Sequence, residues 1–320
     1  MNGENRPGAE TSSVLAIDIG GTKMAAAVVD SSGAIYAERQ TPTRAVSADA
    51  LFQRLVSLCD AVLQESQTRV DTLAGIGVGC GGPMRYPEGA VSPLNIPLWR
   101  EFPLRARLQA QYGRPTAVDN DAKAYALGEC WIGGGQGARS VLGIVVSTGV
   151  GGGVVVNGRL VHGAHGNAGH IGHVSVSARG PRCICGALGC LEAIASGPSL
   201  VRQAQRLATR TGEPLPVGMT AVDLEQRARE GDEPARTLFR QAGTALGRGI
   251  AAAANLIDLD RVVIGGGVSR ASDLFWPSLQ RALTRAARLD FTRNLDVRVS
   301  TLRVSASLAG AAALIFLSDE

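Results

Sequence analysis

The fold is decided by the stretch Val14–Lys23, whose sequence is V-L-A-I-D-I-G-G-T-K. An apolar run that contains Asp18 ends in two glycines, a hydroxyl and an ammonium group, and extended sequence resumes at Met24. This order predicts two strands joined by a glycine turn. Backbone N–H groups of such a turn can point toward phosphate oxygens, and the hydroxyl can donate as well. One glycine turn on its own is an ordinary tight hairpin about as often as a phosphate site.

The same pattern recurs in the second half of the chain. The apolar run from Val141 leads into S-T-G at 147–149, then into a run that turns at N-G, a strong hairpin signal. A third glycine turn follows R-V-V-I at 261–264. None has the spacing of a P-loop or of a dinucleotide-binding unit. Matched turns in a duplicated context predict that nucleotide phosphates are bound by Asp18, Gly20, Gly21, Thr22, Lys23, Thr148, Gly149, Gly151, Gly265, Gly266 and Gly267.

The duplication predicts two α/β halves whose glycine hairpins face each other across a cleft. Helices are expected over 48–67, 198–210 and 234–256, the last rich in Ala and Arg with few helix breakers. The expected organisation is a disordered N-terminal extension, a small N-terminal α/β domain and a large C-terminal α/β domain that contains the loop 173–192. Their expected bounds are 1–13, 14–118 plus 303–320, and 119–302.

Composition excludes several classes of protein. The 320 residues carry a net charge of +4, and the arginines are scattered rather than clustered, so no nucleic-acid partner is expected. The longest apolar stretch, 308–317, is half of the roughly 20 residues that span a bilayer, so no membrane partner is expected. The first thirteen residues are polar and lack the apolar core of a signal peptide. We therefore expect a cytoplasmic protein.

Histidine and cysteine are clustered. All four histidines fall between positions 162 and 173, and three of the six cysteines follow closely. One imidazole and three thiolates form the closed tetrahedral set of a structural zinc site, here His173, Cys183, Cys185 and Cys190. The alternative is ordinary buried thiols or a disulfide pair, and disulfides are rare in the cytosol. Because a complete set leaves no open position for an activated water, the pattern disfavours a zinc hydrolase.

Three polar residues, Asp119-Asn120-Asp121, end the apolar run P-T-A-V and open a helical sequence. One of them could simply cap that helix. A cap needs only one residue, however, and the carboxyl end of a strand is where α/β folds bind ligands. A carboxylate at this place can take the proton of a hydroxyl that attacks a γ-phosphate. We therefore favour a catalytic interpretation.

With these motifs the chain resembles the ROK family of sugar kinases and related repressors, from Asp18 to about Leu317. The most specific part is C-I-C-G-A-L-G-C-L-E at 183–192, which matches the family pattern C-x-C-G-x-x-G-C-x-E. The resemblance implies a duplicated actin/hexokinase-like (ribonuclease H-like) two-domain fold with an inter-domain cleft for ATP and sugar. It also implies a homodimer or homotetramer.

The resemblance further implies roles for individual residues. Asp121 would be the general base, and Mg²⁺ would bridge the ATP phosphates near Asp18. His173 would ligate zinc beside the sugar, with the zinc holding the sugar-binding loop rigid. The sugar would be bound by Asn120, Glu192, Gly82 in C-G-G-P and Asn95 in S-P-L-N-I-P-L-W.

Two positions depart from the family pattern. His170 stands where Glu is common, and a neutral imidazole offers one donor and one acceptor in place of a charged acceptor. Either the sugar preference or activity is altered, or His170 substitutes as an acceptor with similar specificity. Lys123 stands where Asn is common, and it could reach the phosphates or point to solvent.

The sequence therefore predicts an ATP-dependent kinase that phosphorylates the 6-hydroxyl of a hexose or an N-acetylhexosamine. The alternative is a non-catalytic sugar-binding regulator of the same family without a DNA-binding domain. The identity of the sugar, and the choice between ATP and polyphosphate as donor, remain open at this point.

Overall fold

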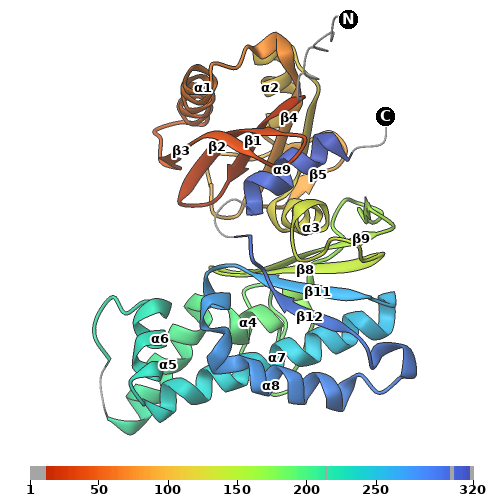
Figure 1. The fold of residues 1–320 in the computed structure, drawn as a ribbon. Helices are drawn as coiled ribbons and strands as arrows, with labels where there is room; N and C mark the ends of the chain where they lie inside the picture. The colour runs from red at the N-terminus through yellow and green to blue at the C-terminus, as the bar shows by residue number, and fades with distance from the viewer. Residues whose placement is uncertain (1–11, 213–214, 303–305, 318–320) are drawn as a thin grey trace, which may run out of the picture. The chain divides into compact units, whose positions relative to one another are not determined.

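The computed structural model describes residues 12–212, 215–302 and 306–317 (Figure 1). The chain divides into two compact units, Met1–Ala124 with Ser307–Glu320 and Tyr125–Ala306. The first division falls inside helix α3 (Asp121–Ile132), a few residues beyond the boundary expected before Asp119. As a result, Asp119, Asn120 and Asp121 belong to the first unit. Residues 1–11 of the expected N-terminal extension lie outside the described residues.

The first unit is built on a five-stranded mixed sheet in the order β3-β2-β1-β4-β7. The β1–β2 and β2–β3 pairs are antiparallel, whereas β4 and β7 run parallel to β1. The strands are β1 (Ser13–Ile19), β2 (Lys23–Asp30), β3 (Ile35–Pro42), β4 (Leu73–Cys80) and β7 (Thr116–Asn120). A short hairpin, β5 (Met84–Arg85) with β6 (Ala90–Val91), follows β4.

Three longer helices pack in this unit: α1 (Ala48–Glu65), α2 (Leu104–Tyr112) and α9 (Ala306–Phe316), with a short 3-10 turn η1 (Val70–Thr72). Helix α9 contains most of the apolar stretch noted in the sequence, and it lies directly on β4. A Cβ atom at Gly77 would collide with the carbonyl of Ala311, so glycine permits this close approach. The described residues contain no helix long and apolar enough to cross a membrane.

The second unit repeats this topology. Its sheet has the order β10-β9-β8-β11-β12, again an antiparallel part followed by two parallel neighbours. The strands are β8 (Ser140–Val146), β9 (Val150–Val156), β10 (Arg159–Leu160), β11 (Arg261–Gly265) and β12 (Asp296–Val299). The predicted duplication of strand, glycine turn and strand is therefore confirmed.

The helices of the second unit are α4 (Leu191–Ala195), α5 (Gly197–Thr211), α6 (Ala221–Arg229), α7 (Glu233–Ile257) and α8 (Ser272–Ala286). Short 3-10 turns are η2 (Ile171–His173), η3 (Gly267–Ala271) and η4 (Asp290–Thr292). Helices α7 and α8 lie side by side (Figure 1), and Gly243 and Gly247 bring α7 against backbone of α8. The three predicted helices are present with ends shifted by one or two residues. Helix α1 stops before Gln67 because that residue has a left-handed φ of 53°.

Candidate active site

Two carboxylates meet at the carboxyl edge of the first sheet. Strands β1, β4 and β7 run parallel there, with Asp18 paired in register to Gly79 and Gly79 to Asp119. A Cβ atom built on Gly79 would lie 3.4 Å from the Cα of Asp121 and 3.8 Å from Oδ1 of Asp18. Gly79 therefore leaves the space in which Asp18 and Asp121 approach one another. Gly79 was not among the predicted site residues, although it lies in the glycine-rich run G-V-G-C-G-G-P.

The proximity of these carboxylates changes the acidity of Asp18. Burial, followed by the negative charge of Asp121, raises the pKa of Asp18 from 3.8 to about 6. A hydrogen bond with Ser307 and the cation of Lys23 act in the opposite direction but do not cancel these effects. Asp18 therefore holds its proton into the mildly acidic range.

Asn120 and Asp121 stand at the junction of β7 and α3. The backbone N–H of Ala122 donates to Oδ1 of Asn120 at 3.1 Å and to Oδ1 of Asp121 at 2.8 Å, so both take part in local capping. A Cβ atom at Gly82 would lie 3.4 Å from Nδ2 of Asn120. Four of the predicted residues, Asp18, Gly82, Asn120 and Asp121, are therefore brought together at one edge.

The first glycine turn is closed by its own backbone. The N–H of Gly20 donates to the carbonyl of Lys23 at 3.0 Å, and the hydroxyl of Thr43 donates to the carbonyl of Gly20 at 2.8 Å. The Gly20 N–H is therefore committed within the hairpin. The side chain of Asn95 fills the space beside Gly21, which adds Asn95 to this part of the unit. The ammonium of Lys23 donates to Gln40.

The second and third glycine turns lie next to each other in the second unit. A Cβ atom at Gly267 would lie 3.8 Å from the hydroxyl oxygen of Ser147, which connects the two turns. Gly266 has a φ of 91°, and a side chain there would collide with the carbonyl of Val146. Glu192 lies against the second turn, where its Oε2 accepts the N–H of Val150 at 2.9 Å. Gly151 belongs to β9, one residue further along.

A cavity of about 880 Å³ opens beside these two turns, entirely within the second unit. Ser147 and Thr148 of the second turn line it, and the rest of the lining comes from α5, α6, the residues just before α6, η3 and one residue of α7. Its apolar lining includes Val201, Met219, Val222, Phe239 and Val268, and its charged lining includes Arg202, Glu225, Arg229 and Arg270. This volume suits a drug-sized or nucleotide-sized ligand. The cavity could not be predicted from the sequence, because segments distant in sequence build it.

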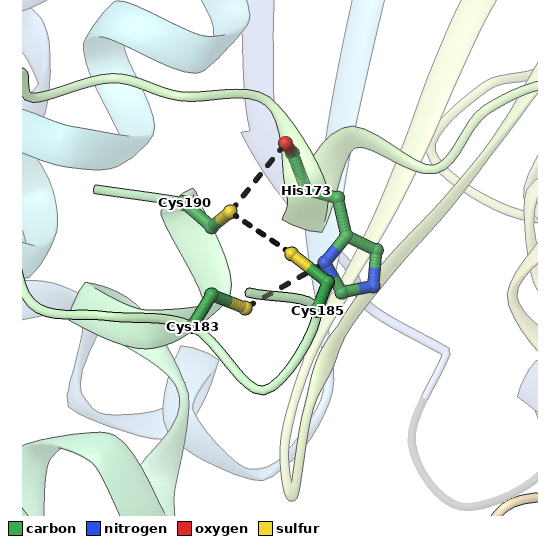
Figure 2. Close-up of side chains that lie close together, drawn as sticks. All are labelled: His173, Cys183, Cys185 and Cys190. Atoms are coloured by element: carbon green, nitrogen blue, oxygen red, sulfur yellow. Dashed lines mark hydrogen bonds between the residues drawn. The ribbon is translucent and has the colours of Figure 1, made fainter. Parts of the chain in front are cut away.

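The predicted His/Cys set is brought together in one cluster (Figure 2). One ligand atom from each of His173, Cys183, Cys185 and Cys190 lies within 4.8 Å of the others. The sulfurs of Cys185 and Cys190 are 3.6 Å apart, and Nδ1 of His173 is 3.7 Å from the sulfur of Cys183. A sulfur separation of 3.6 Å is too long for a disulfide. The three cysteines are free thiols, which removes the disulfide alternative.

The thiols of this cluster differ in acidity. A backbone hydrogen bond of Ala187, followed by contacts with neighbouring thiols, lowers the pKa of Cys185 to about 7. Burial, followed by the contact with Cys185, raises the pKa of Cys190 to about 12. The loop turns tightly because Gly189, at a φ of 69°, lies where a side chain would collide with the carbonyl of Ser177.

His170 lies beside this cluster. It precedes η2, which ends at His173, and the centroids of the two imidazole rings are 6.2 Å apart. Its side chain is exposed. The residue that departs from the family pattern is therefore next to the predicted metal ligand.

A family model described as the ROK family matches residues 14–317. The chain is 34% identical over 311 residues to a glucokinase of Halalkalibacterium halodurans, with 94% of each chain covered. It is 37% identical over 300 residues to an N-acetylmannosamine kinase of Escherichia coli, covering 94% of this chain and 97% of the relative. A ROK family glucokinase from Streptomyces griseus, solved in complex with glucose and AMPPNP, has a TM-score of 0.81 at 31% identity, covering 95% of this chain and 99% of that one. The chain belongs to the ROK family, and its two mixed sheets form the actin/hexokinase-like fold.

Proposed function

We propose that this protein is an ATP-dependent sugar kinase that phosphorylates the 6-hydroxyl of a hexose or an N-acetylhexosamine. The observation that carries the proposal is the pair Asp18 and Asp121 beside Asn120 at one sheet edge. The curated relatives described above are a glucokinase and an N-acetylmannosamine kinase at 34% and 37% identity. These two relatives support a sugar as the acceptor.

In the proposed reaction Asp121 is the general base. Its carboxylate takes the proton of the sugar hydroxyl while the hydroxyl oxygen attacks the γ-phosphorus and ADP leaves. Asp18, whose carboxyl group is ionised above its pKa of about 6, would supply the negative charge that holds Mg²⁺ with the ATP phosphates. Sugar hydroxyls would be bound by Asn120, Gly82, Asn95, Glu192, His170 and His173, as the family resemblance implies.

The cavity of the second unit supports ATP rather than polyphosphate as the donor. An inorganic polyphosphate has no apolar part, whereas a purine base would be bound between apolar side chains such as Met219, Phe239 and Val268. Thr148 and Gly149, with the turn Gly265–Gly267, lie near that cavity and would bind phosphate oxygens. Asp18 and the turn of residues 20–23 would meet the phosphates with their Mg²⁺, which neutralises the developing charge.

The His/Cys cluster fits a structural zinc ion. Tetrahedral zinc with Zn–S distances near 2.3 Å places neighbouring ligand atoms roughly 3.7 Å apart. The two separations in this cluster, 3.6 Å and 3.7 Å, agree with that geometry. His173, Cys183, Cys185 and Cys190 would hold the ion, which would fix the loop and orient His170 and Glu192 toward the substrate.

The experiment that tests the function is sugar phosphate formation by the purified protein across a sugar panel. The panel contains glucose, mannose, allose, fructose, N-acetylglucosamine and N-acetylmannosamine, each with Mg-ATP and with Mg-polyphosphate. We expect turnover with ATP on at least one sugar and its loss in Asp121→Asn. Sugar binding with no turnover on any sugar would instead support a non-catalytic sugar-binding regulator.

A further inference from the structure

Lys123, one of the two lysines of the chain, is buried although its side chain carries a charge. The side chain of Lys123 is 1% exposed, and that of Asp119 is 2% exposed. The ammonium nitrogen of Lys123 lies 2.8 Å from Oδ1 and 3.0 Å from Oδ2 of Asp119, which precedes it by four residues at the end of β7. Burial of two charges is costly unless they are paired and hydrogen-bonded, so such a pair calls for an explanation.

This pair encloses the Asn120–Asp121 turn. Oδ1 of Asp119 also accepts the backbone N–H of Asn120 at 2.7 Å. The same carboxylate therefore holds the backbone at the end of β7 and the first turn of α3, and the two candidate substrate-contacting residues lie between these points. The ammonium also lies 5.4 Å from the centre of the Tyr86 ring, which belongs to the segment that follows Gly82.

The pair also places two opposite charges close to Asp121 in the chain. Asp18 on β1 and the thiol of Cys80 on β4 interact electrostatically with Asp121 from neighbouring strands, and Asp119 and Lys123 lie on its own segment. Without Lys123, Asp119 would be a third carboxylate in this region beside Asp18 and Asp121. Because Lys123 carries the opposite charge, the Asp119–Lys123 pair adds no net charge to this region.

We propose that Lys123 is a positioning residue for phosphoryl transfer, which fixes the Asn120–Asp121 turn through Asp119 and neutralises that carboxylate beside the catalytic base. The inference rests on the proposed function, because it takes Asp121 as the base. Lys123 itself need not touch either substrate. Its position also answers the alternatives left by the sequence, since the side chain is buried rather than directed to solvent.

The test compares three variants with the wild type: Lys123→Met, Asp119→Asn and the double variant Asp119→Asn/Lys123→Met. Arg54→Met serves as the matched control, because it removes one positive charge from an exposed position of the same unit. The measurements are the pH profile of kcat/KM, kcat at saturation, and the melting temperature. A purely structural role would lower the melting temperature of both single variants without moving the pH profile.

We expect the acid limb of kcat/KM to move by about half a pH unit or more to higher pH in Lys123→Met and to lower pH in Asp119→Asn. In the double variant the limb returns to its wild-type position, while kcat falls at least tenfold because the ammonium no longer holds the turn. Arg54→Met leaves both unchanged.

The proposal is wrong if the single variants fold and share the wild-type pH profile. It is also wrong if the double variant retains the wild-type kcat. This test remains valid if the single variants do not fold, because the double variant removes both charges of the pair. Both results can be distinguished from failure of the proposed function. If the proposed function is wrong, the wild type itself phosphorylates no sugar, and the inference about Lys123 fails with it.

Discussion

Asp18 and Asp121 lie on either side of Gly79, whose missing side chain leaves room for both carboxylates at one edge of the first sheet. Burial and the charge of Asp121 together raise the pKa of Asp18 to about 6. Two interacting carboxylates titrate as a pair, so the acid side of the activity profile reports both groups.

Replacing the proposed base should remove catalysis and spare binding. We expect Asp121→Asn to lower kcat by about 10²- to 10⁴-fold, because general-base catalysis contributes that much. The sugar dissociation constant should change by less than about threefold, since an amide keeps a similar shape. Steady-state kinetics and calorimetry measure the two effects, with Asp71→Asn as an exposed control. Retention of more than a tenth of kcat would contradict the role of Asp121.

The raised pKa of Asp18 predicts a pH-dependent change in stability. Because the folded-state pKa of about 6 lies above the ordinary 3.8, the contribution of Asp18 is fully present below pH 4 and is lost as the pH rises through 6. Asp18→Asn removes this loss. We compare the free energy of unfolding of the variant with that of the wild type at each pH. This difference should favour the variant by up to about 3 kcal/mol more at pH 8 than at pH 4. Urea unfolding at both pH values tests this, and an equal effect at both would contradict it.

The His/Cys cluster predicts one zinc ion per chain. Elemental analysis of the purified protein should find it, and Cys190→Ser should lower both the zinc content and the melting temperature, because a four-ligand structural site loses a ligand. Cys130→Ser is the matched control, since Cys130 lies outside the cluster. Equal zinc content in the two variants would show that the cluster does not hold the metal.

Filling the cavity of the second unit should weaken the binding of ATP, the phosphoryl donor, and leave the binding of the sugar unchanged. Ala221 lines the cavity, whereas Val217 is fully exposed and absent from its lining. We expect Ala221→Trp to raise KM for ATP at least tenfold, because the indole would occupy space needed by the base, and to leave sugar affinity unchanged. Val217→Trp should leave KM for ATP unchanged. A normal KM for ATP in Ala221→Trp would place nucleotide binding elsewhere.

The departure at His170 predicts a change in sugar preference. Glutamate is a charged acceptor and a neutral imidazole is not, so His170→Glu should change the ranking of sugars by kcat/KM. His165→Glu, an exposed position in the same glycine-rich stretch, is the control. An unchanged ranking would mean that His170 simply substitutes as an acceptor.

Local sequence was sufficient for much of the fold. The glycine turns after 14–19 and 141–146 each join antiparallel strands, and the C-x-C spacing did bring its thiols together. Spacing suffices in these cases because the interacting residues are close along the chain. The helix ends were less predictable, since local backbone conformations such as the positive φ of Gln67 set them.

Other features depend on how distant segments pack. Gly79 matters only because β1 and β7 flank β4 in the sheet, which its own sequence does not reveal. The cavity requires α5, α6 and η3 to pack against one another. The burial of Lys123 depends on Asp119 and on Tyr86. The ring of Tyr86 comes from the β5–β6 hairpin, which lies well before Lys123 in the sequence. A lysine on a helix is ordinarily a solvated residue, so sequence alone favours the wrong environment.

The central claim is that Asp121 enables transfer of the γ-phosphoryl group of ATP to a sugar hydroxyl. The most direct measurement is ³¹P NMR of a reaction containing Mg-ATP and the best sugar of the panel, with wild-type protein and with Asp121→Asn. We predict a sugar 6-phosphate signal that grows in step with ADP for the wild type, and neither signal for the variant. Formation of inorganic phosphate in place of a sugar phosphate, or equal sugar phosphorylation by the variant, would contradict the claim.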